Sequence, residues 1–354
     1  MRFSLFLLAL WAAPLMAAPN TAPQDVRNVP THDCILTPPA ATDAAVKNVI
    51  FMIGDGMGSE QLWAGWLANK GRLNIVTLPV TGFSCTTSAS HTVTDSAAGG
   101  TALACGHKAI NGHVGLTPSG HSVVSLLNLA EEQGKSTGLV VTKDITDATP
   151  AAFYAHVADR RMAAEIAAQL PASGAEFVRG GGHAHFTDEQ LAAMREGGMD
   201  VELTAEKHMA PASRRGDVLP QDVARALEVL SANEKGFFLM VEGSQIDTAC
   251  HANDLREMVY EMLDFDKAVG VVLEWMKTHP DTLLVITADH QTGGLSLLDG
   301  DKEKGSVRGV FTTDWHSGIT VPVYAAGAGA APFGGIHDNT GVFELIKAAM
   351  QPQH

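Results

Sequence analysis

The sequence predicts an α/β fold, a three-layer α/β/α sandwich around a mostly parallel, doubly wound sheet. Short apolar runs without polar alternation recur along the chain, which is typical of strands buried on both faces. Amphipathic stretches separate these runs, and such alternation of strand and helix is the pattern of a parallel sheet. Acidic and histidine residues directly follow several of the runs, at the edge where open α/β sheets bind ligands.

The runs and the stretches between them divide the chain into expected elements. We expect strands over residues 47–53, 136–141, 237–241, 283–287 and 320–326. We expect helices over residues 97–104, 122–132, 151–160, 161–170, 221–230, 256–276 and 342–350. Pro150 suits the first turn of the helix 151–160. Residues 180–220 are rich in glycine, histidine and charge with weak periodicity, which indicates a surface excursion.

The composition is that of a globular protein with an acidic balance. Of the 354 residues, 45% are hydrophobic and 18% are charged. The 24 basic and 39 acidic residues give a net charge of −15, which argues against nucleic-acid binding as a main role and against anionic membranes. The 15 histidines are a high count, and histidine is the commonest nitrogen ligand of transition metals.

The N-terminus has the pattern of a secretory signal peptide over residues 1–17. Arg2 precedes an apolar run, and Ala17 is the expected cleavage point. The run is shorter than the roughly 20 residues that a membrane span needs, and no later run is longer. We therefore expect a periplasmic or secreted protein without a membrane segment. The rest of the chain divides into an extended N-terminal arm, residues 18–45, and a single domain, residues 46–354.

The cysteines leave the disulfide pairing open. Export makes disulfides possible, and four cysteines allow three connectivities if all of them pair. Cys105 lies in a helix of small residues, which favours a buried free thiol. The four positions are Cys34, Cys85, Cys105 and Cys250.

Asp95 and Ser96 place a carboxylate beside a hydroxyl where a helix of small residues is expected to begin. A helix N-terminus offers free backbone N–H groups and partial positive charge, which suit an anion such as phosphate. Aspartate and serine are also common N-caps with no further role, and this stretch alone favours the cap. A serine beside divalent cations is instead an effective nucleophile.

The polar residues after the expected strands form a candidate metal-binding set. Taken singly, each is explained as a turn former, a satisfied core histidine or a helix cap. Together, mixed histidine and carboxylate ligands suit Zn²⁺, whereas threonine with carboxylates suits Mg²⁺. Two metals about 4 Å apart stabilise the entering and the departing oxygen of a displacement at phosphorus. The set is Asp55, Asp147, Thr149, Glu242, Asp247, His251, Asp289, His290 and His316.

Arg160 is the candidate for holding a phosphoryl group. A guanidinium group can contact two phosphoryl oxygens at once. An exposed arginine at the end of a helix is the more common situation, and Arg160 ends the expected helix 151–160. The assignment therefore depends on the other segments.

These segments resemble the alkaline phosphatase family. The family's nucleophile segment is recognisable in Asp95-Ser96-Ala97, and its first metal-binding strand end in residues 53–58. Matching segments follow one another in the family's order from residue 47 to about residue 326, so the resemblance covers most of the chain. The remaining segments are residues 147–150 with Arg160, 242–251, 287–290 and 316–318.

The resemblance implies two Zn²⁺ ions, one Mg²⁺ ion and hydrolysis of small phosphate monoesters through a phosphoserine on Ser96. It implies that Asp95 orients Arg160 and that Asp147 lies close to the magnesium. The implied ligands are Asp247, His251 and His316 for one zinc, Asp55, Asp289, His290 and the reacting Ser96 for the other, and Asp55, Thr149 and Glu242 for magnesium.

The sequence departs from the family's pattern at several points. Thr248 stands where family members often carry Lys or His near the phosphate, so we expect weaker retention of phosphate. Asp147 in place of a histidine favours magnesium over a third zinc. The spacing between His290 and His316 is short for this family, which indicates that a surface subdomain is missing and leaves the homodimer of longer relatives open.

Other functions remain alternatives. A phosphodiesterase or a sulfatase of the same fold is the nearest one, although diesterases of this fold tend to use threonine and sulfatases need a modified Cys or Ser. A non-catalytic protein that binds metal or phosphate is the other. The presence of both Ser96 and Arg160 argues against it, because metal storage needs neither.

Overall fold

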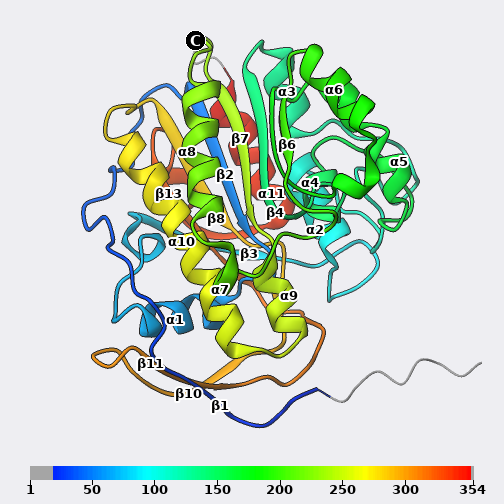
Figure 1. Ribbon diagram of the computed structural model, residues 1–354. Coiled ribbons are helices and arrows are strands. Elements are labelled where there is room, and N and C mark those ends of the chain that lie inside the picture. Colours follow the sequence, from blue (N-terminus) through cyan, green and yellow to red (C-terminus); the bar gives the residue numbers. More distant parts are fainter. Residues whose placement is uncertain (1–18, 352–354) are drawn as a thin grey trace, which may run out of the picture.

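A computed structural model describes residues 19–351, so the expected signal peptide, residues 1–17, lies outside the described residues. The centre of the structure is a nine-stranded sheet (Figure 1). Its order is β14 (Gly335–Asp338), β3 (Val80–Cys85), β13 (Val321–Gly327), β8 (Thr282–Thr287), β2 (Asn48–Gly54), β7 (Phe237–Gly243), β4 (Ser136–Asp144), β5 (Phe177–Gly181) and β6 (Asp200–Leu203).

The sheet is mostly parallel, as predicted. Only β13 runs antiparallel to its neighbours, β8 and β3, whereas all other neighbouring pairs of this sheet are parallel. The strands β2, β4, β7 and β8 are buried along their whole length. This is why their sequences are continuous apolar runs: a strand covered on both faces has no side facing water.

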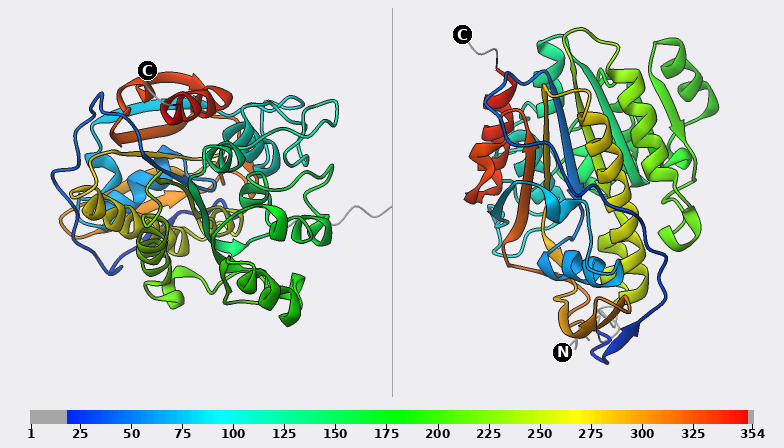
Figure 2. Two further views of the ribbon diagram at one scale, coloured as in Figure 1. Left: turned by 90° about the horizontal axis from the view of Figure 1, so that it is seen from above. Right: turned by 90° about the vertical axis from the view of Figure 1, so that its left-hand side faces the viewer.

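Helices cover both faces of the sheet, and successive residues of β2 show the two layers. Phe51 packs into one apolar core and Met52 into the other, because neighbouring side chains of a strand point to opposite faces. In the right-hand view of Figure 2, α10 and α11 lie on opposite sides of the strands. One layer contains α2 (Ser96–Cys105), α3 (Leu126–Glu132), α4 (Ala148–Ala151), α5 (Ala163–Ala167), α6 (Asp188–Glu196) and α11 (Asn339–Met350); the other contains α1 (Ser59–Ala68), α8 (Val218–Leu230), α9 (Gln245–His251) and α10 (Leu255–Met276).

The prediction of a helix over residues 151–160 is wrong. The helix α4 is a single turn that ends at Ala151, and Arg160 lies in the loop that follows. Val157 instead exchanges two backbone hydrogen bonds with Val114, at 2.9 and 3.0 Å. This bridge to a distant part of the chain takes the N–H and C=O groups that a helix would need.

Residues 180–220 contribute to the sheet. Strand β6 pairs in parallel with β5 and forms one edge of the nine-stranded sheet. The helix α6 precedes it, and the single turn α7 (Ala212–Arg215) follows. The segment thus contains a pairing edge in addition to its exposed helix.

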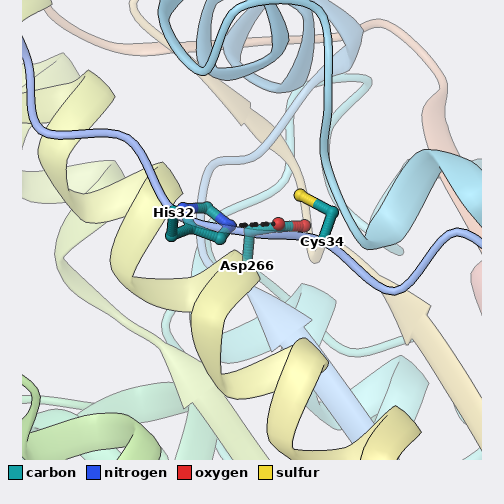
Figure 3. Close-up of side chains that lie close together, drawn as sticks. All are labelled: His32, Cys34 and Asp266. Atoms are coloured by element: carbon teal, nitrogen blue, oxygen red, sulfur yellow. Dashed lines mark hydrogen bonds and ion pairs between the residues drawn. The ribbon is translucent and has the colours of Figure 1, made fainter.

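The N-terminal arm runs along the outside of the domain. Its strand β1 (Gln24–Val26) pairs with β11 (Ser306–Val310), which also pairs with β10 (Ser296–Asp301), in a separate three-stranded sheet. Further along the arm, His32 Nε2 lies 2.8 Å from Asp266 Oδ2 of α10, with Cys34 beside them (Figure 3). The arm is therefore extended and attached to the domain along its length, and Thr42 near its end also bridges Ala328.

At the cluster of His32, Cys34 and Asp266, hydrogen bonds to Asp266 attach the arm to α10. We call this set of hydrogen bonds the clasp. Asp266 accepts from the backbone N–H groups of Asn74 at 2.8 Å and Ile75 at 2.9 Å, in addition to His32. The other ring nitrogen of His32 is buried without an acceptor, so the proton belongs on the nitrogen that faces Asp266. Both carboxylate oxygens are thus already satisfied, which disfavours this cluster as a metal site.

Two further features concern the sequence expectations. All four cysteines are free thiols, and Cys105 is buried as expected. Among residues 19–351, no helix is both long and apolar enough to cross a membrane.

Replacing Asp266 with asparagine tests the clasp. Asp266→Asn puts an N–H₂ group where one oxygen now accepts hydrogen bonds, so we expect the free energy of unfolding to fall by about 1–3 kcal/mol in urea denaturation. The matched control is Asp33→Asn, an exposed carboxylate of the same arm, for which no measurable change is expected. Equal effects of the two variants would contradict the clasp.

Candidate active site

Ser96 begins the helix α2, and the small residues of this helix let it approach the strand ends closely. Asp95 is the N-cap, and its Oδ1 accepts a hydrogen bond from Ala98 N at 3.0 Å. A Cβ at Gly99 would lie 3.0 Å from the carbonyl oxygen of Asp289, and one at Gly100 would lie 3.2 Å from the Cα of Thr149 in α4. Glycine therefore lets the helix pack closely here, and Ser96 is brought against the carboxyl edge of the sheet.

The parallel direction of the strands collects the acidic residues at that edge. Asp55 directly follows β2, Glu242 is the next-to-last residue of β7, and Asp289 follows β8. Helix α9 then carries Asp247 and His251, which are one turn apart and point the same way. The predicted metal-binding residues from distant parts of the chain thus meet in one place.

The first group of possible ligands consists of Asp55, Asp289 and His290, all of them buried. The Nε2 atom of His290 lies 3.1 Å from Asp289 Oδ2 and 3.6 Å from Asp55 Oδ1. Both of these oxygens are buried without a hydrogen-bond partner. Ser96 Oγ lies 3.1 Å from the same nitrogen. Unpartnered buried oxygens fit a cation, and the serine hydroxyl is next to them.

Thr292 fixes the orientation of this group. Its Oγ1 lies 2.7 Å from Asp247 Oδ1 and 3.2 Å from His290 Nδ1. Because a carboxylate only accepts, the hydroxyl donates to Asp247 and accepts from the imidazole. The lone pair of His290 Nε2 is then directed toward Ser96, where a metal would need it. Thr292, which lies two residues after His290, was not identified from the sequence.

The second group consists of Asp247, His251 and His316. The Nδ1 atoms of the two histidines face backbone carbonyls, that of Asp314 at 2.6 Å and that of Thr94 at 2.8 Å. Carbonyls only accept, so both Nδ1 atoms carry the proton and the two Nε2 atoms face each other as lone pairs at 3.1 Å. Asp247 Oδ1 lies 3.2 Å from the first of them. Lone pairs that converge in this way fit a metal ion.

Burial shifts the protonation of these groups. Burial, with the charge of neighbouring side chains, lowers the pKa of His290 and of His316 to about 3, so both rings are neutral. Burial and then the charge of Asp247 raise the pKa of Asp289 to about 6. Burial also raises the pKa of Glu242 to about 8. The edge is therefore crowded with carboxyl groups whose negative form needs compensation.

A third set, Asp55, Thr149 and Glu242, shares Asp55 with the first group. The Thr149 hydroxyl is buried without a partner, whereas Glu242 Oε2 accepts from Ser244 Oγ at 2.7 Å. The remaining oxygen of Asp55 faces Lys143 Nζ at 3.4 Å. The unpartnered hydroxyl and the carboxylates fit a cation that prefers oxygen ligands.

Lys143 was not identified from the sequence. It lies in β4 beyond the expected strand end at residue 141, in a stretch interpreted as a loop, where a lysine is ordinarily exposed. In the structure it is buried, and Nζ lies 3.1 Å from Asp247 Oδ2 and 3.8 Å from Asp147 Oδ2. Burial lowers the pKa of Lys143, but the surrounding carboxylates outweigh it and raise the pKa well above its usual value.

Arg160 is held at the entrance of the site by two carboxylates. One guanidinium nitrogen lies 2.9 Å from Asp147 Oδ1 and another 3.5 Å from Asp95 Oδ2. Burial would raise the pKa of Asp147, but Lys143 and Arg160 outweigh it and lower the pKa to about 2. Asp95 Oδ2 also accepts from the backbone N–H of Gly112 at 2.9 Å. The arginine is thus fixed in direction while its side chain stays partly exposed.

These groups open into one cavity of about 720 Å³, large enough for a small organic ester. Ser96, Arg160, Asp147 and the second ligand group line it. Trp315 forms part of its wall, half-exposed, with its ring stacked on His316 at 4.8 Å between centroids. Trp315 was not identified from the sequence.

Comparison with known proteins gives one consistent result. The family model described as Alkaline phosphatase matches residues 46–196 and 182–311. Alkaline phosphatase 4 from Bacillus subtilis (strain 168) is 30% identical over 86% of this chain and 89% of its own length. Streptomycin-6-phosphate phosphatase from Streptomyces griseus is 32% identical over 89% of this chain and 94% of its own length.

Solved structures agree with the sequence relatives. The alkaline phosphatase from the Antarctic bacterium TAB5 superposes with a TM-score of 0.81 at 32% identity, covering 88% of this chain and 99% of that chain. This confirms the predicted fold class. With a family model over most of its length and relatives of this similarity, the chain belongs to the alkaline phosphatase family, whose members are enzymes that hydrolyse phosphate monoesters.

Proposed function

We propose that this alkaline phosphatase hydrolyses small phosphate monoesters through a phosphoserine intermediate on Ser96. One observation carries the proposal: Ser96 Oγ lies 3.1 Å from His290 Nε2, beside carboxylate oxygens of Asp55 and Asp289 that are buried without a partner. A hydroxyl used only as a helix cap has no need of such neighbours. The arrangement supports a nucleophile next to bound cations.

We infer three cation sites. Zinc suits the two groups that contain histidine, namely Asp247, His251 and His316, and Asp55, Asp289 and His290 with Ser96. Magnesium suits Asp55, Thr149 and Glu242 with Asp147 close by, and it is bound in a solved structure of a variant of the Antarctic enzyme. When bound, such cations lower the pKa of a hydroxyl or a water and compensate charge on the reacting oxygens.

The chain's own residues bind and orient the substrate. Arg160 points into the cavity as a planar fork that matches two phosphoryl oxygens, and Asp95 and Asp147 hold it in that direction. The Ser96 oxygen forms a bond to phosphorus while the ester oxygen leaves and takes up a proton. Water then replaces the serine oxygen, which releases inorganic phosphate and restores the hydroxyl.

The alternatives have less support. A phosphodiesterase of this fold tends to use threonine, whereas Ser96 occupies the position here, and a sulfatase needs a modified Cys or Ser. A protein that only binds metal or phosphate would not need a serine and an oriented arginine in one cavity. Ser96 and Arg160 therefore favour turnover of monoesters.

We also propose export and self-association. Residues 1–17 support passage to the periplasm or to the medium, because their pattern is that of a signal peptide. A homodimer is supported by Trp63 on α1 and Leu298 on the contacting strand β10, both of which are exposed. Exposed apolar side chains on neighbouring elements commonly mark association surfaces. The mass in solution, measured by light scattering, tests the dimer.

The reaction class is tested with an aryl phosphate and an aryl phosphodiester, each with and without chelator. We expect turnover of the monoester only, lost on chelation and reduced on the order of 10³-fold or more in Ser96→Ala, because the nucleophile is gone. Ser119→Ala, an exposed serine, is the control and should keep full activity. Activity that survives chelation would contradict the proposal, and diester turnover would favour the alternative.

The crowded carboxyl groups predict how the metal-free protein responds to pH. Glu242 has its pKa raised to about 8 in the folded state, so the folded state retains a proton that the unfolded chain has lost. The stability from this proton is present at low pH and is lost as pH rises through about 8. We expect the Tm of chelated protein to be lower at pH 9 than at pH 7, and the gain in Tm on adding metal to be larger at pH 9. An unchanged Tm of the chelated protein would contradict this.

Residue 248 is a threonine and not a cationic side chain, which predicts fast release of phosphate. Thr248 is exposed on α9 next to Asp247, so a lysine there adds a positive charge near the site without repacking the core. We expect Thr248→Lys to lower the inhibition constant of inorganic phosphate roughly two- to fivefold, the strength of an exposed ion pair. Thr248→Gln, similar in length but uncharged, should match wild type. A wild-type constant as low as that of Thr248→Lys would exclude this explanation.

A further inference from the structure

Lys143 is a buried cation beside Asp55, a carboxylate of the candidate third site. Its side chain is only 7% exposed, and Nζ donates to Asp247 Oδ2 at 3.1 Å and to Asp55 Oδ2 at 3.4 Å. We propose that Lys143 is a resident cation of the third site and competes with magnesium for Asp55, so that wild-type protein holds magnesium weakly. This rests on the proposed function, which assigns Asp55 to that site.

The two oxygens of Asp55 have different surroundings. Oδ1 lies 3.6 Å from His290 Nε2 and has no hydrogen-bond partner, so it remains available to the first ligand group. Oδ2 is then the oxygen left to bind magnesium, and it faces Lys143 Nζ. A magnesium ion at Asp55 must therefore share this oxygen with an ammonium group or displace it.

The backbone around Lys143 holds the side chain at the site. Ile145 N donates to Gly181 O at 3.1 Å, and Met209 N donates to Thr142 O at 3.2 Å, so both flanks of Lys143 are attached to other segments. These bonds fix the main chain at Lys143, and burial of the side chain keeps the ammonium group largely away from water. A buried ammonium stays where carboxylates compensate it, and here these are Asp55, Asp247 and Asp147.

Charge explains why the lysine and magnesium compete. An ammonium group next to a ligand oxygen repels a divalent cation and neutralises part of the charge that would attract it. Without the lysine, Asp55 Oδ2 loses its partner, while the Thr149 hydroxyl already has none. Such a pocket of oxygen ligands is what magnesium prefers. Removing the ammonium should therefore tighten magnesium binding.

The test is a titration of the zinc-loaded full-length protein with MgCl₂ by calorimetry, together with elemental analysis after dialysis. We expect wild-type protein to lose its magnesium on dialysis. We expect Lys143→Met to bind one magnesium per chain at least about tenfold more tightly than wild type, and Lys143→Arg to remain weak because the charge is kept. Equal affinity in wild type and Lys143→Met would overturn the proposal.

The control is Lys267→Met, which removes a lysine paired with Asp217 at 2.6 Å, outside the site. It should bind magnesium as wild type does, and tighter binding would overturn the proposal by showing a general effect of charge. If Lys143→Met does not fold, elemental analysis of the wild-type protein is sufficient. Retention of one magnesium per chain through dialysis overturns the proposal. Absence of monoesterase activity in wild type would instead refute the proposed function.

Discussion

The carboxylates at the carboxyl edge of the sheet impose the main constraint on this structure. Asp55, Glu242, Asp247 and Asp289 are all nearly inaccessible to water, and the burial of ionised carboxylates is costly without compensation. Hydrogen bonds compensate only some of their oxygens, since Asp55 Oδ1 and Asp289 Oδ2 have no donor. Unpartnered oxygens of this kind fit cations, and a cation that bound at this edge would stabilise the fold.

Close approach of backbone segments makes this concentration of groups possible. Gly99 and Gly100 let α2 lie close to Asp289 after β8 and to Thr149 of α4, where an added Cβ would make tight contacts. Gly56 serves the same purpose after β2: its φ of +72° favours glycine, and a Cβ there would lie 2.7 Å from Thr292 Oγ1. The small residues of α2 thus allow Ser96 to lie next to the ligand groups.

The two positive side chains of the site have different roles. Arg160 is partly exposed at the cavity, where it can meet a phosphoryl group, and Asp95 and Asp147 fix its direction. Lys143 is buried on the inner side of the same carboxylates and does not line the cavity. Arg160 thus faces the cavity, and Lys143 faces the candidate metal-binding carboxylates. Asp147 connects them, since it lies within 4 Å of both.

The sequence alone determined the fold class and most members of the site. Strands buried on both faces must be continuous apolar runs, so the sequence predicts β2, β4, β7 and β8. It also shows the acidic residues that follow these strands. Tertiary structure decided what depends on distant partners. The bridge of Val157 to Val114 ended the expected helix early, β13 runs antiparallel, and the clasp joins His32 to Asp266 across most of the chain. Lys143 shows the reason: a lysine after a strand is ordinarily in water, and only carboxylates from β2 and α9 hold it inside.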